Sequence, residues 1–504
     1  MFRNQHSALL LLFAAACLQA NVRLPHILSS RMVLQRNRPI HFWGWADPGE
    51  KVSVTLESET ASATAGKLGR WSLYLPPRPA GGPFSIRVQG NNTIVLDDVL
   101  IGDVWFASGQ SNMEIPLEGY PGSSVIQNAA EEIRNATHPN IRLLFVPHKA
   151  SSYPLRDYPR GWTRCTPETA KTFSAVAYFF GVDVSKAEHV PIGLIDSTWG
   201  GTPIASWISM EGISSDVGLM PIFAEHTQML DQEAQLLKSH AAERRAIAKA
   251  KAAGQPPPKF PWHPNVFSWM PAWLYNGMVA PALPLPIRGV IWYQGASDAA
   301  KARAPMYVKS FPALIHDWRS HWQEGNFPFL YVQISSFDAA PGEDWAMIRE
   351  AQRRTLGVAN TAMAVTIDIG KLHQIHPPDK QDLGKRLTLA ARALAYGESI
   401  EYSGPLFRQT STDGSAIRVW FSHAQSGLVA KGGLLQGFEI AGADHHFVPA
   451  TARIEGKAVV VSSAAVAHPK FVRYGWANAP TVNLYNRAGL PASPFTSERV
   501  MPKP

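Results

Sequence analysis

Two residues far apart in this chain have the types that acyl transfer requires, Ser111 and His376. A serine hydroxyl becomes a nucleophile when a histidine close to it can accept its proton. Ser111 follows an apolar run at residues 104–107 that is typical of a buried strand, and Gly109 permits a tight turn between them. We expect Ser111 to open a helix, whose dipole favours the negative charge that acyl transfer develops. His376 stands in a second strand–loop–helix context, so the pair predicts a nucleophile and its base.

An acyl-transfer site also needs hydrogen-bond donors for the oxyanion, and two segments between these residues can supply them. Residues 199–203 contain the pair Gly200-Gly201, and residues 292–295 contain Gln294. A glycine pair after a strand lets backbone N–H groups approach a bound carbonyl, and an amide side chain can add a donor. We therefore predict an oxyanion pocket made by the N–H groups of Ser111 and Gly201 with help from Gln294. The serine does not lie in a Gly-x-Ser-x-Gly pattern, so the α/β-hydrolase elbow is not supported.

The middle of the chain alternates short apolar runs with segments of helical spacing, which favours an α/β fold with a parallel sheet flanked by helices. The ligand site of such a sheet lies beyond the carboxyl ends of its strands, where Ser111 and His376 both fall. The apolar runs are residues 192–195, 289–293, 329–333 and 363–367, and the helical spacing covers residues 345–356 and the leucines Leu383, Leu387 and Leu394.

The two flanks of this region have the alternating apolar pattern of antiparallel β modules. The N-terminal flank shows it in residues 52–56, 71–75 and 84–88, and the C-terminal flank in residues 417–421, 438–440 and 459–461. A charged, alanine-rich stretch at residues 227–254 predicts a helix inserted into the middle region. We divide the chain into a signal peptide at 1–20, a β domain at 21–100, a catalytic domain at 101–400 with a helical insertion at about 210–285, and a β domain at 401–504.

Composition narrows the classes of function. The 504 residues are 45% hydrophobic and 17% charged, which suits several packed cores rather than a disordered chain. The net charge of +8 comes from basic residues scattered along the chain, so we expect no nucleic-acid partner. The sequence has no Gly-rich phosphate-binding loop followed by lysine, so we expect no nucleotide ligand. His373 beside His376, and the pair His445-His446, lack the spacing of a metal motif. No metal and no other cofactor is predicted.

The first twenty residues resemble an export signal. Arg3 supplies a positive charge, residues 8–16 an apolar core, and Ala20 a small residue before cleavage. The apolar core is too short to span a bilayer, so contact with a membrane is expected only if Cys17 is lipidated. We predict a periplasmic or extracellular protein, with a lipoprotein as the alternative. Removal of the signal would leave Cys165 as the only certain thiol and allow no intrachain disulfide.

The motifs together resemble the sialate O-acetylesterase family, within the SGNH class of serine esterases. The resemblance implies a flavodoxin-like catalytic domain between two β modules, which removes acetyl groups from sugar hydroxyls. It rests on matches at Ser108-Gly-Gln-Ser-Asn-Met113, Gly200-Gly-Thr-Pro-Ile204 with Trp207, Trp292-Tyr-Gln-Gly295, Ile375-His-Pro377 with Lys380, Gly384, Arg386 and Leu387, Arg473-Tyr-Gly-Trp476 and Asn483-Leu-Tyr-Asn486.

The chain departs from the family pattern at the acids. Relatives commonly have glutamate where this chain has Ala296, and often asparagine where it has Asp298. SGNH enzymes usually have aspartate three residues before the histidine, but His373 stands there. Asp368 and Asp298 are then the candidates for the acid or for a supporting role, with Asp368 the nearest plausible acid in sequence, although a backbone carbonyl could orient His376 instead.

Three functions remain open at this point. The first is an exported serine esterase that removes O-acetyl groups from sugars and is most similar to sialate O-acetylesterases, with an O-acetylated sugar or glycan as its partner. The second is an acetyl esterase for plant polysaccharides such as acetylxylan. The third is a carbohydrate-binding protein with a decayed esterase site, which Ala296 and the absent aspartate favour. Ser111, His376 and Gly201 favour activity.

Overall fold

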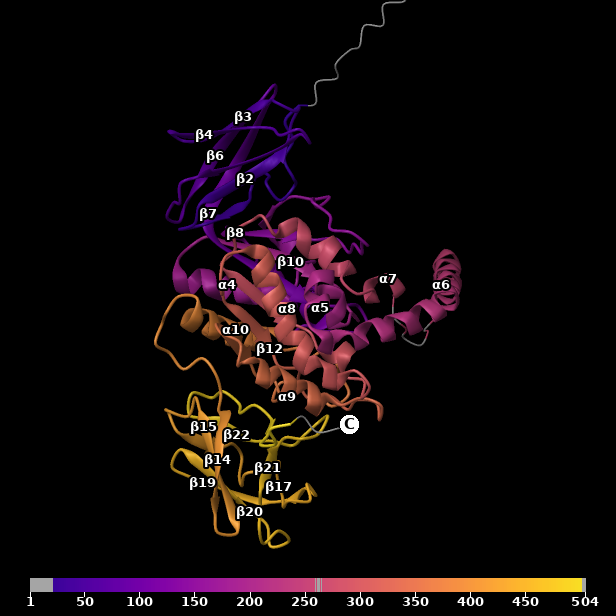
Figure 1. Ribbon diagram of the computed structural model, residues 1–504, viewed down its shortest axis with the longest axis vertical. Coiled ribbons are helices and arrows are strands. Elements are labelled where there is room, and N and C mark those ends of the chain that lie inside the picture. The colour runs from indigo at the N-terminus through magenta and orange to yellow at the C-terminus, as the bar shows by residue number, and fades with distance from the viewer. Residues whose placement is uncertain (1–20, 259, 261–262, 264, 501–504) are drawn as a thin grey trace, which may run out of the picture.

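The computed structural model describes residues 21–258, 260, 263 and 265–500. The predictions for the signal peptide at residues 1–20 and for Cys17 lie outside the described residues. Along the long axis of the molecule, Figure 1 shows N-terminal strands at one end, a mixed α/β region in the middle and C-terminal strands at the other end.

A parallel sheet forms the centre of the molecule, as predicted. Its strands lie in the order β13-β12-β11-β7-β10, and β8 and then an antiparallel β9 follow beyond β10. Read from β10 to β13 and numbered along the chain without β8, these five strands have the order 2-1-3-4-5, which is the flavodoxin order. The α/β fold is therefore confirmed. The strands are β7 (Thr93–Gly109), β8 (His138–Phe145), β9 (Thr163–Cys165), β10 (Ile192–Thr198), β11 (Gly289–Tyr293), β12 (Phe329–Val332) and β13 (Thr361–Ala364).

Helices cover both faces of this sheet. Successive side chains of a strand point to opposite faces, and two neighbours on β7 show which helix lies on each. Trp105 packs on Phe180 of α4 with ring centroids 5.0 Å apart, and Phe106 packs on Trp318 of α8 at 5.6 Å. Helix α10 contacts α4, and α9, which matches the helix predicted at 345–356, contacts α8. These helices are α4 (Ala175–Glu188), α8 (Tyr307–Trp322), α9 (Trp345–Thr355) and α10 (Lys380–Leu394).

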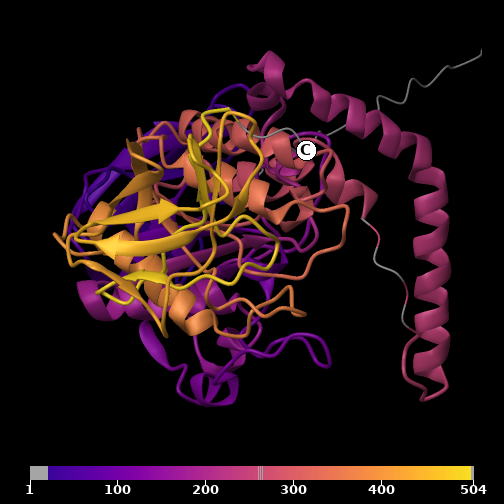
Figure 2. The ribbon, with the colours of Figure 1, turned by 90° about the horizontal axis from the view of Figure 1, so that it is seen from below.

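The long helix α6 (Pro221–Ala252) contains most of the predicted helical stretch at 227–254 and extends away from the body of the molecule (Figure 2). In the sequence, α6 belongs to the segment that connects β10 to β11, together with α5 (Met210–Ser214) and α7 (Val266–Trp269). Within the part of the chain that the structure describes, no helix has both the length and the apolarity needed to cross a membrane. The remaining helices are α1 (Ser111–Glu114), α2 (Ala129–Arg134) and α3 (Pro167–Ala170).

The N-terminal strands are joined to the central sheet by β7 itself. The first part of β7 pairs with β6 and β1, and its last seven residues pair with β10. The domain boundary that we place at residue 100 therefore falls inside a continuous strand. The other strands here are β1 (Val33–Gln35), β2 (Ile40–Trp45), β3 (Lys51–Leu56), β4 (Glu59–Thr64), β5 (Arg70–Leu75) and β6 (Gly81–Gln89).

The C-terminal strands enclose a second hydrophobic core that includes Val419, Ile440 and Val461. Two antiparallel sheets have the orders β14-β15-β20-β19 and β18-β17-β21-β23, and β16 pairs with β22. The strands are β14 (Leu406–Asp413), β15 (Ala416–Ser422), β16 (Leu428–Ala430), β17 (Phe438–Ala441), β18 (Val448–Pro449), β19 (Thr451–Glu455), β20 (Ala458–Ser462), β21 (Phe471–Tyr474), β22 (Leu484–Asn486) and β23 (Phe495–Thr496).

Candidate active site

Ser111 lies at the carboxyl end of the central strand, where β7 ends at Gly109 and α1 begins. The turn requires a glycine, because Gly109 has φ +138° and a Cβ there would lie 2.2 Å from the carbonyl oxygen of Tyr293. Gln110 fixes the turn from its other side, since its Oε1 accepts the N–H groups of Gly295 and Ser297, each at 3.1 Å. The turn leaves the Ser111 side chain half-buried at the edge of the sheet.

The structure places His376 against Ser111. The distance from His376 Nε2 to Ser111 Oγ is 3.0 Å, although 265 positions separate the two residues. Asn112 holds the histidine loop in place, because its Nδ2 donates to the carbonyl of Ile375 at 2.9 Å. Its Oδ1 in turn accepts from Lys380 Nζ at 2.6 Å, at the start of α10. The residue after the serine therefore positions the segment that contains the histidine.

The other ring nitrogen of His376 contacts a hydroxyl rather than an acid. Its Nδ1 lies 3.0 Å from the Oγ of Ser124, a buried serine in the turn after α1. Asp368 does not reach His376, because its carboxylate forms a bidentate pair with Arg386 at 2.7 and 2.8 Å. The orienting group is thus neither the Asp368 carboxylate nor the backbone carbonyl that we considered. A single serine in a loop has no sequence signal that marks this role.

Burial and a nearby cation lower the pKa of His376 to about 4. The cation is Lys380, whose own pKa burial lowers to about 7. With a pKa of about 4, His376 is neutral at neutral pH, and a neutral imidazole is the form that can accept the serine proton. A tautomer that donates Nδ1–H to Ser124 Oγ leaves the Nε2 lone pair facing Ser111.

Gln294 is not available as an oxyanion donor in this structure, which corrects the role predicted for it. Its Nε2 donates to the carbonyl of Thr202 at 3.1 Å and to Asp298 Oδ2 at 2.5 Å, so both amide hydrogens are used. Tyr307 donates its hydroxyl to Gln294 Oε1 at 2.9 Å. The amide therefore braces the loop after β10 rather than facing a substrate.

Asp298 belongs to the same brace and does not contact His376. Besides Gln294, its Oδ2 accepts the backbone N–H of Ile204 at 2.9 Å. Burial raises the pKa of Asp298 to about 6, against the opposing charge of Arg303. Asp298 thus stabilises the loop that contains Gly201. Of the two roles considered for it, this is the supporting role and not that of the acid that orients His376.

Two of the backbone N–H groups predicted as oxyanion donors remain available for that role. Among the residues that the structure describes, neither the N–H of Ser111 nor that of Gly201 has a protein acceptor. Gly201 has φ +70°, and Trp269 Nε1 donates to its carbonyl at 2.7 Å. The adjacent Gly200 lies against the nucleophile, since a Cβ on it would be 3.3 Å from the Cβ of Ser111.

One carboxylate at the site was missed by the sequence analysis. Glu114 Oε2 accepts the N–H of Gly200 at 2.7 Å, and its Oε1 lies 2.7 Å from His148 Nε2. The available signal was its position one helical turn after Ser111, which puts both side chains on the same face of α1. Glu114 thus fixes the glycine loop beside the nucleophile.

The histidines considered as metal ligands lie elsewhere. His373 is exposed with Nδ1 3.8 Å from Asp338, and His445 Nδ1 lies 2.8 Å from Glu498 in the C-terminal strands. In the described ranges, no group of three or more His, Cys, Asp or Glu side chains is arranged to hold a metal ion.

A flavodoxin-like sheet with a Ser–His contact at its carboxyl edge is the arrangement of SGNH-class serine hydrolases, and comparisons with known proteins place the chain among carbohydrate esterases. The family model "Carbohydrate esterase, sialic acid-specific acetylesterase" matches residues 262–393. The sialate O-acetylesterase of Homo sapiens is 31% identical over 439 residues, which cover 79% of this chain and 76% of the human protein. That of Rattus norvegicus is 30% identical and covers 97% of both chains.

A solved structure agrees with these matches. A carbohydrate acetylesterase from Xanthomonas citri is 37% identical with a TM-score of 0.81, and the match covers 95% of this chain and all of the other. The chain belongs to the sialate O-acetylesterase family, and it is a carbohydrate O-acetylesterase.

Proposed function

We propose that this chain removes acetyl groups from sugar hydroxyls through Ser111 and His376. Ser111 Oγ attacks the acetyl carbonyl while His376 Nε2 takes its proton. The N–H groups of Ser111 and Gly201 stabilise the oxyanion. His376 then returns the proton to the sugar oxygen as the C–O bond breaks, which releases the sugar and leaves an acetyl group on Ser111. Water activated by His376 hydrolyses this acetyl-enzyme and releases acetate.

The observation that carries this proposal is the 3.0 Å contact between His376 Nε2 and Ser111 Oγ at the carboxyl edge of the sheet. This distance is within the range for proton transfer from nucleophile to base. The contact also argues against a carbohydrate-binding protein with a decayed esterase site, because a lost function does not maintain a nucleophile and base in register. We further propose O-acetylated sialic acids as substrates, by similarity to the relatives named above.

The test compares hydrolysis of three acetyl esters by the wild type and by Ser111→Ala. The esters are O-acetylated sialic acid, acetylated xylose and p-nitrophenyl acetate, and released acetate is measured. We expect the wild type to hydrolyse the sialate ester fastest and Ser111→Ala to lose activity on all three by several orders of magnitude. Faster hydrolysis of the xylose ester would replace sialate with a plant sugar. Near-normal activity of a folded Ser111→Ala protein would contradict the mechanism.

We also propose that the protein is exported, on the basis of the charge, apolar core and small residue within residues 1–20. Fractionation of the producing cells, followed by N-terminal sequencing of the mature protein, tests this. We expect a mature chain that begins close to residue 21. A chain that begins at Met1 in the cytoplasmic fraction would contradict export, and a blocked, lipid-bearing Cys17 would identify the lipoprotein alternative.

A further inference from the structure

Three neighbouring strands of the central sheet end beside one another, and each presents a side chain at the same edge. Ser111 follows β7, Trp199 follows β10, and Phe145 ends β8, with His148 shortly after it. Paired strands lie about 4.8 Å apart and Phe145 is level with Ala107, so the end of β8 lies roughly 12 Å from the end of β7. The row therefore leads away from the nucleophile across the edge of the sheet.

The middle of this row is a flat aromatic pair. The rings of His148 and Trp199 are stacked with centroids 4.3 Å apart and an angle of 5° between their planes. Glu114 fixes the histidine through the 2.7 Å contact with its Nε2, and 39% of the His148 side chain is exposed. Because Glu114 lies on the same short helix as Ser111, the exposed ring is held at a defined place beside the nucleophile. A flat exposed ring suits the C–H face of a pyranose.

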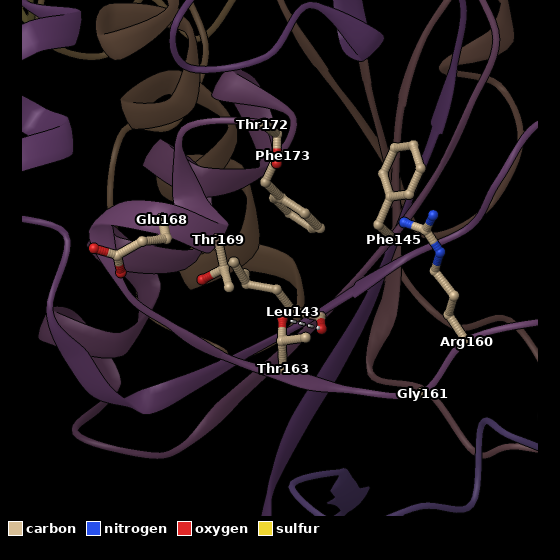
Figure 3. A pocket seen from close by; sticks show the side chains of 9 residues that line it. All are labelled: Leu143, Phe145, Arg160, Gly161, Thr163, Glu168, Thr169, Thr172 and Phe173. Carbon is tan, nitrogen blue, oxygen red and sulfur yellow. Dashed lines mark hydrogen bonds between the residues drawn. The ribbon is translucent and has the colours of Figure 1, made fainter.

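The row ends at a cavity of about 420 Å³ bounded by β8, β9 and the segment around α3. Figure 3 shows Phe145, at the end of β8, and Phe173, in the segment between α3 and α4, on two sides of this cavity, with Arg160 beside Phe145 and Glu168 across the space. Thr163, Thr169 and Thr172 add hydroxyl groups to its lining. Aromatic rings mixed with a few polar groups are typical of sites that bind small polar ligands, and the volume lies within their usual range.

The cavity wall is tied to the nucleophile helix. The carbonyl of Phe173 accepts the N–H of Leu117 at 2.9 Å, and the next residue, Ser174, donates its hydroxyl to the carbonyl of Met113 at 2.6 Å. Phe145 is 37% exposed, although it ends a strand that is otherwise buried over its preceding four residues. The end of β8 therefore presents an exposed aromatic ring beside a wall that is fixed to α1.

We propose that the His148–Trp199 pair and this cavity are sugar subsites, and that the substrate is an oligosaccharide rather than a free monosaccharide. This inference rests on the proposed function, because the acetylated unit is placed at Ser111. The next unit stacks on His148, and a further unit enters the cavity between Phe145 and Phe173. Both sialyl-oligosaccharides and acetylated plant oligosaccharides offer the pyranose units that these surfaces would bind.

The experiment measures kcat/KM for two pairs of acetyl esters. The pairs are O-acetylated sialyllactose against O-acetylated sialic acid, and acetylated xylotetraose against acetylated methyl xyloside. In the wild type we expect the longer member of at least one pair to be preferred about tenfold or more, and the preferred pair identifies the source of the glycan. Equal kcat/KM within both pairs would overturn the inference.

Variants then locate the preference. We expect His148→Ala and Phe145→Ala each to reduce the long-to-short ratio by about fivefold or more. The matched control is Tyr74→Ala, which removes a ring that is 59% exposed on β5, in the N-terminal sheet. A ratio that stays at the wild-type value in both variants would overturn the inference. If no sugar ester is hydrolysed while p-nitrophenyl acetate is, the proposed function fails instead.

Discussion

The two segments that flank Ser111, residues 375–380 and residues 294–298, both contribute polar side chains close to it but use their hydrogen bonds differently. In the first segment, the two ring nitrogens of His376 lie 3.0 Å from hydroxyl groups, those of Ser111 and Ser124. In the second segment, Gln294 uses both amide hydrogens within the protein, and Asp298 accepts two N–H groups. Residues 375–380 therefore direct a ring nitrogen at the nucleophile, whereas Gln294 and Asp298 hydrogen-bond to each other and to the neighbouring backbone.

This difference separates chemistry from support. A group that must exchange a proton with substrate needs an atom that the protein does not already saturate. A group that only positions a loop is most effective when every donor and acceptor is satisfied, because a partly satisfied buried network is costly. His376 fits the first description, and Gln294 with Asp298 fits the second.

The largest expected effect comes from His376→Ala. Loss of the base should lower kcat for p-nitrophenyl acetate roughly 10⁴-fold or more, as for other Ser–His hydrolases. Gln294→Ala is the matched variant in the other segment, and we expect it to lower kcat far less while reducing stability. Rates are compared per folded protein, determined by circular dichroism. Equal losses of kcat in the two variants would remove the distinction between the segments.

Asp298→Asn should affect stability more than turnover. Below about pH 4, where the wild-type carboxyl is protonated, replacing the buried Asp298 side chain, whose Oδ2 accepts two N–H groups, is expected to lower the free energy of unfolding by about 1–3 kcal/mol. Burial raises the pKa of Asp298 to about 6 in the folded state. The folded protein therefore binds the extra proton, and the wild type should lose stability relative to the variant as pH rises through about 4 to 6. Urea unfolding across this pH range measures both effects. If the difference in free energy of unfolding between the wild type and the variant does not change with pH, the raised pKa of Asp298 is contradicted.

Ser124→Ala tests the hydroxyl that orients His376. A neutral hydrogen bond contributes about 0.5–1.5 kcal/mol, so we expect kcat to fall about 2- to 13-fold. Ser123→Ala, which removes the hydroxyl of the exposed neighbour, is the control and should leave kcat unchanged. An unchanged kcat in Ser124→Ala would show that this contact does not set the histidine tautomer.

Lys380→Met should shift the pH dependence of kcat/KM. The charge of Lys380 is the second cause, after burial, that lowers the pKa of His376 to about 4. Without this cation the pKa of His376 rises, so the histidine becomes protonated, and activity is lost, at a higher pH on acidification. Lys385→Met, on the exposed side of the same helix, should leave the profile unchanged. A profile that moves to lower pH in Lys380→Met would contradict the assignment of this limb to His376.

The smallest expected effect on turnover is that of Asp368→Asn. Its carboxylate pairs with Arg386 rather than with His376, so turnover per active site should stay within about threefold of the wild type. A serine-reactive phosphonate titrates the active sites and corrects for misfolded protein. A loss of about 10⁴-fold per titrated site, the scale of aspartate loss in other Ser–His–Asp enzymes, would make Asp368 the acid after all.

The sequence predicted those parts of the fold and site that depend on local pattern. Apolar runs and helical spacing identified the parallel sheet, and the strand-end positions of Ser111 and His376 led to their pairing. The continuity of β7 across residue 100 could not be predicted, because an apolar run does not show which partners each half of a strand will pair with.

The remaining site contacts depend on side-chain directions that only the folded chain fixes. Ser124 meets His376 across 252 positions, from a loop with no regular pattern. Gln294 stands after a strand, as an oxyanion donor would, but its amide turns toward Asp298. The sequence predicted Gln294 close to the nucleophile but gave no signal for Ser124. The roles of both residues follow from hydrogen bonds that only the folded structure shows.

The most direct test of the central claim is to find which residue carries the acyl chemistry. The protein is treated with a serine-reactive phosphonate until activity on p-nitrophenyl acetate is lost, and the modified peptide is identified by mass spectrometry. The account predicts one phosphonyl group per chain, on Ser111, with loss of activity proportional to labelling and no label in Ser111→Ala. Full labelling of Ser111 with activity retained, or inactivation through another residue, would contradict it.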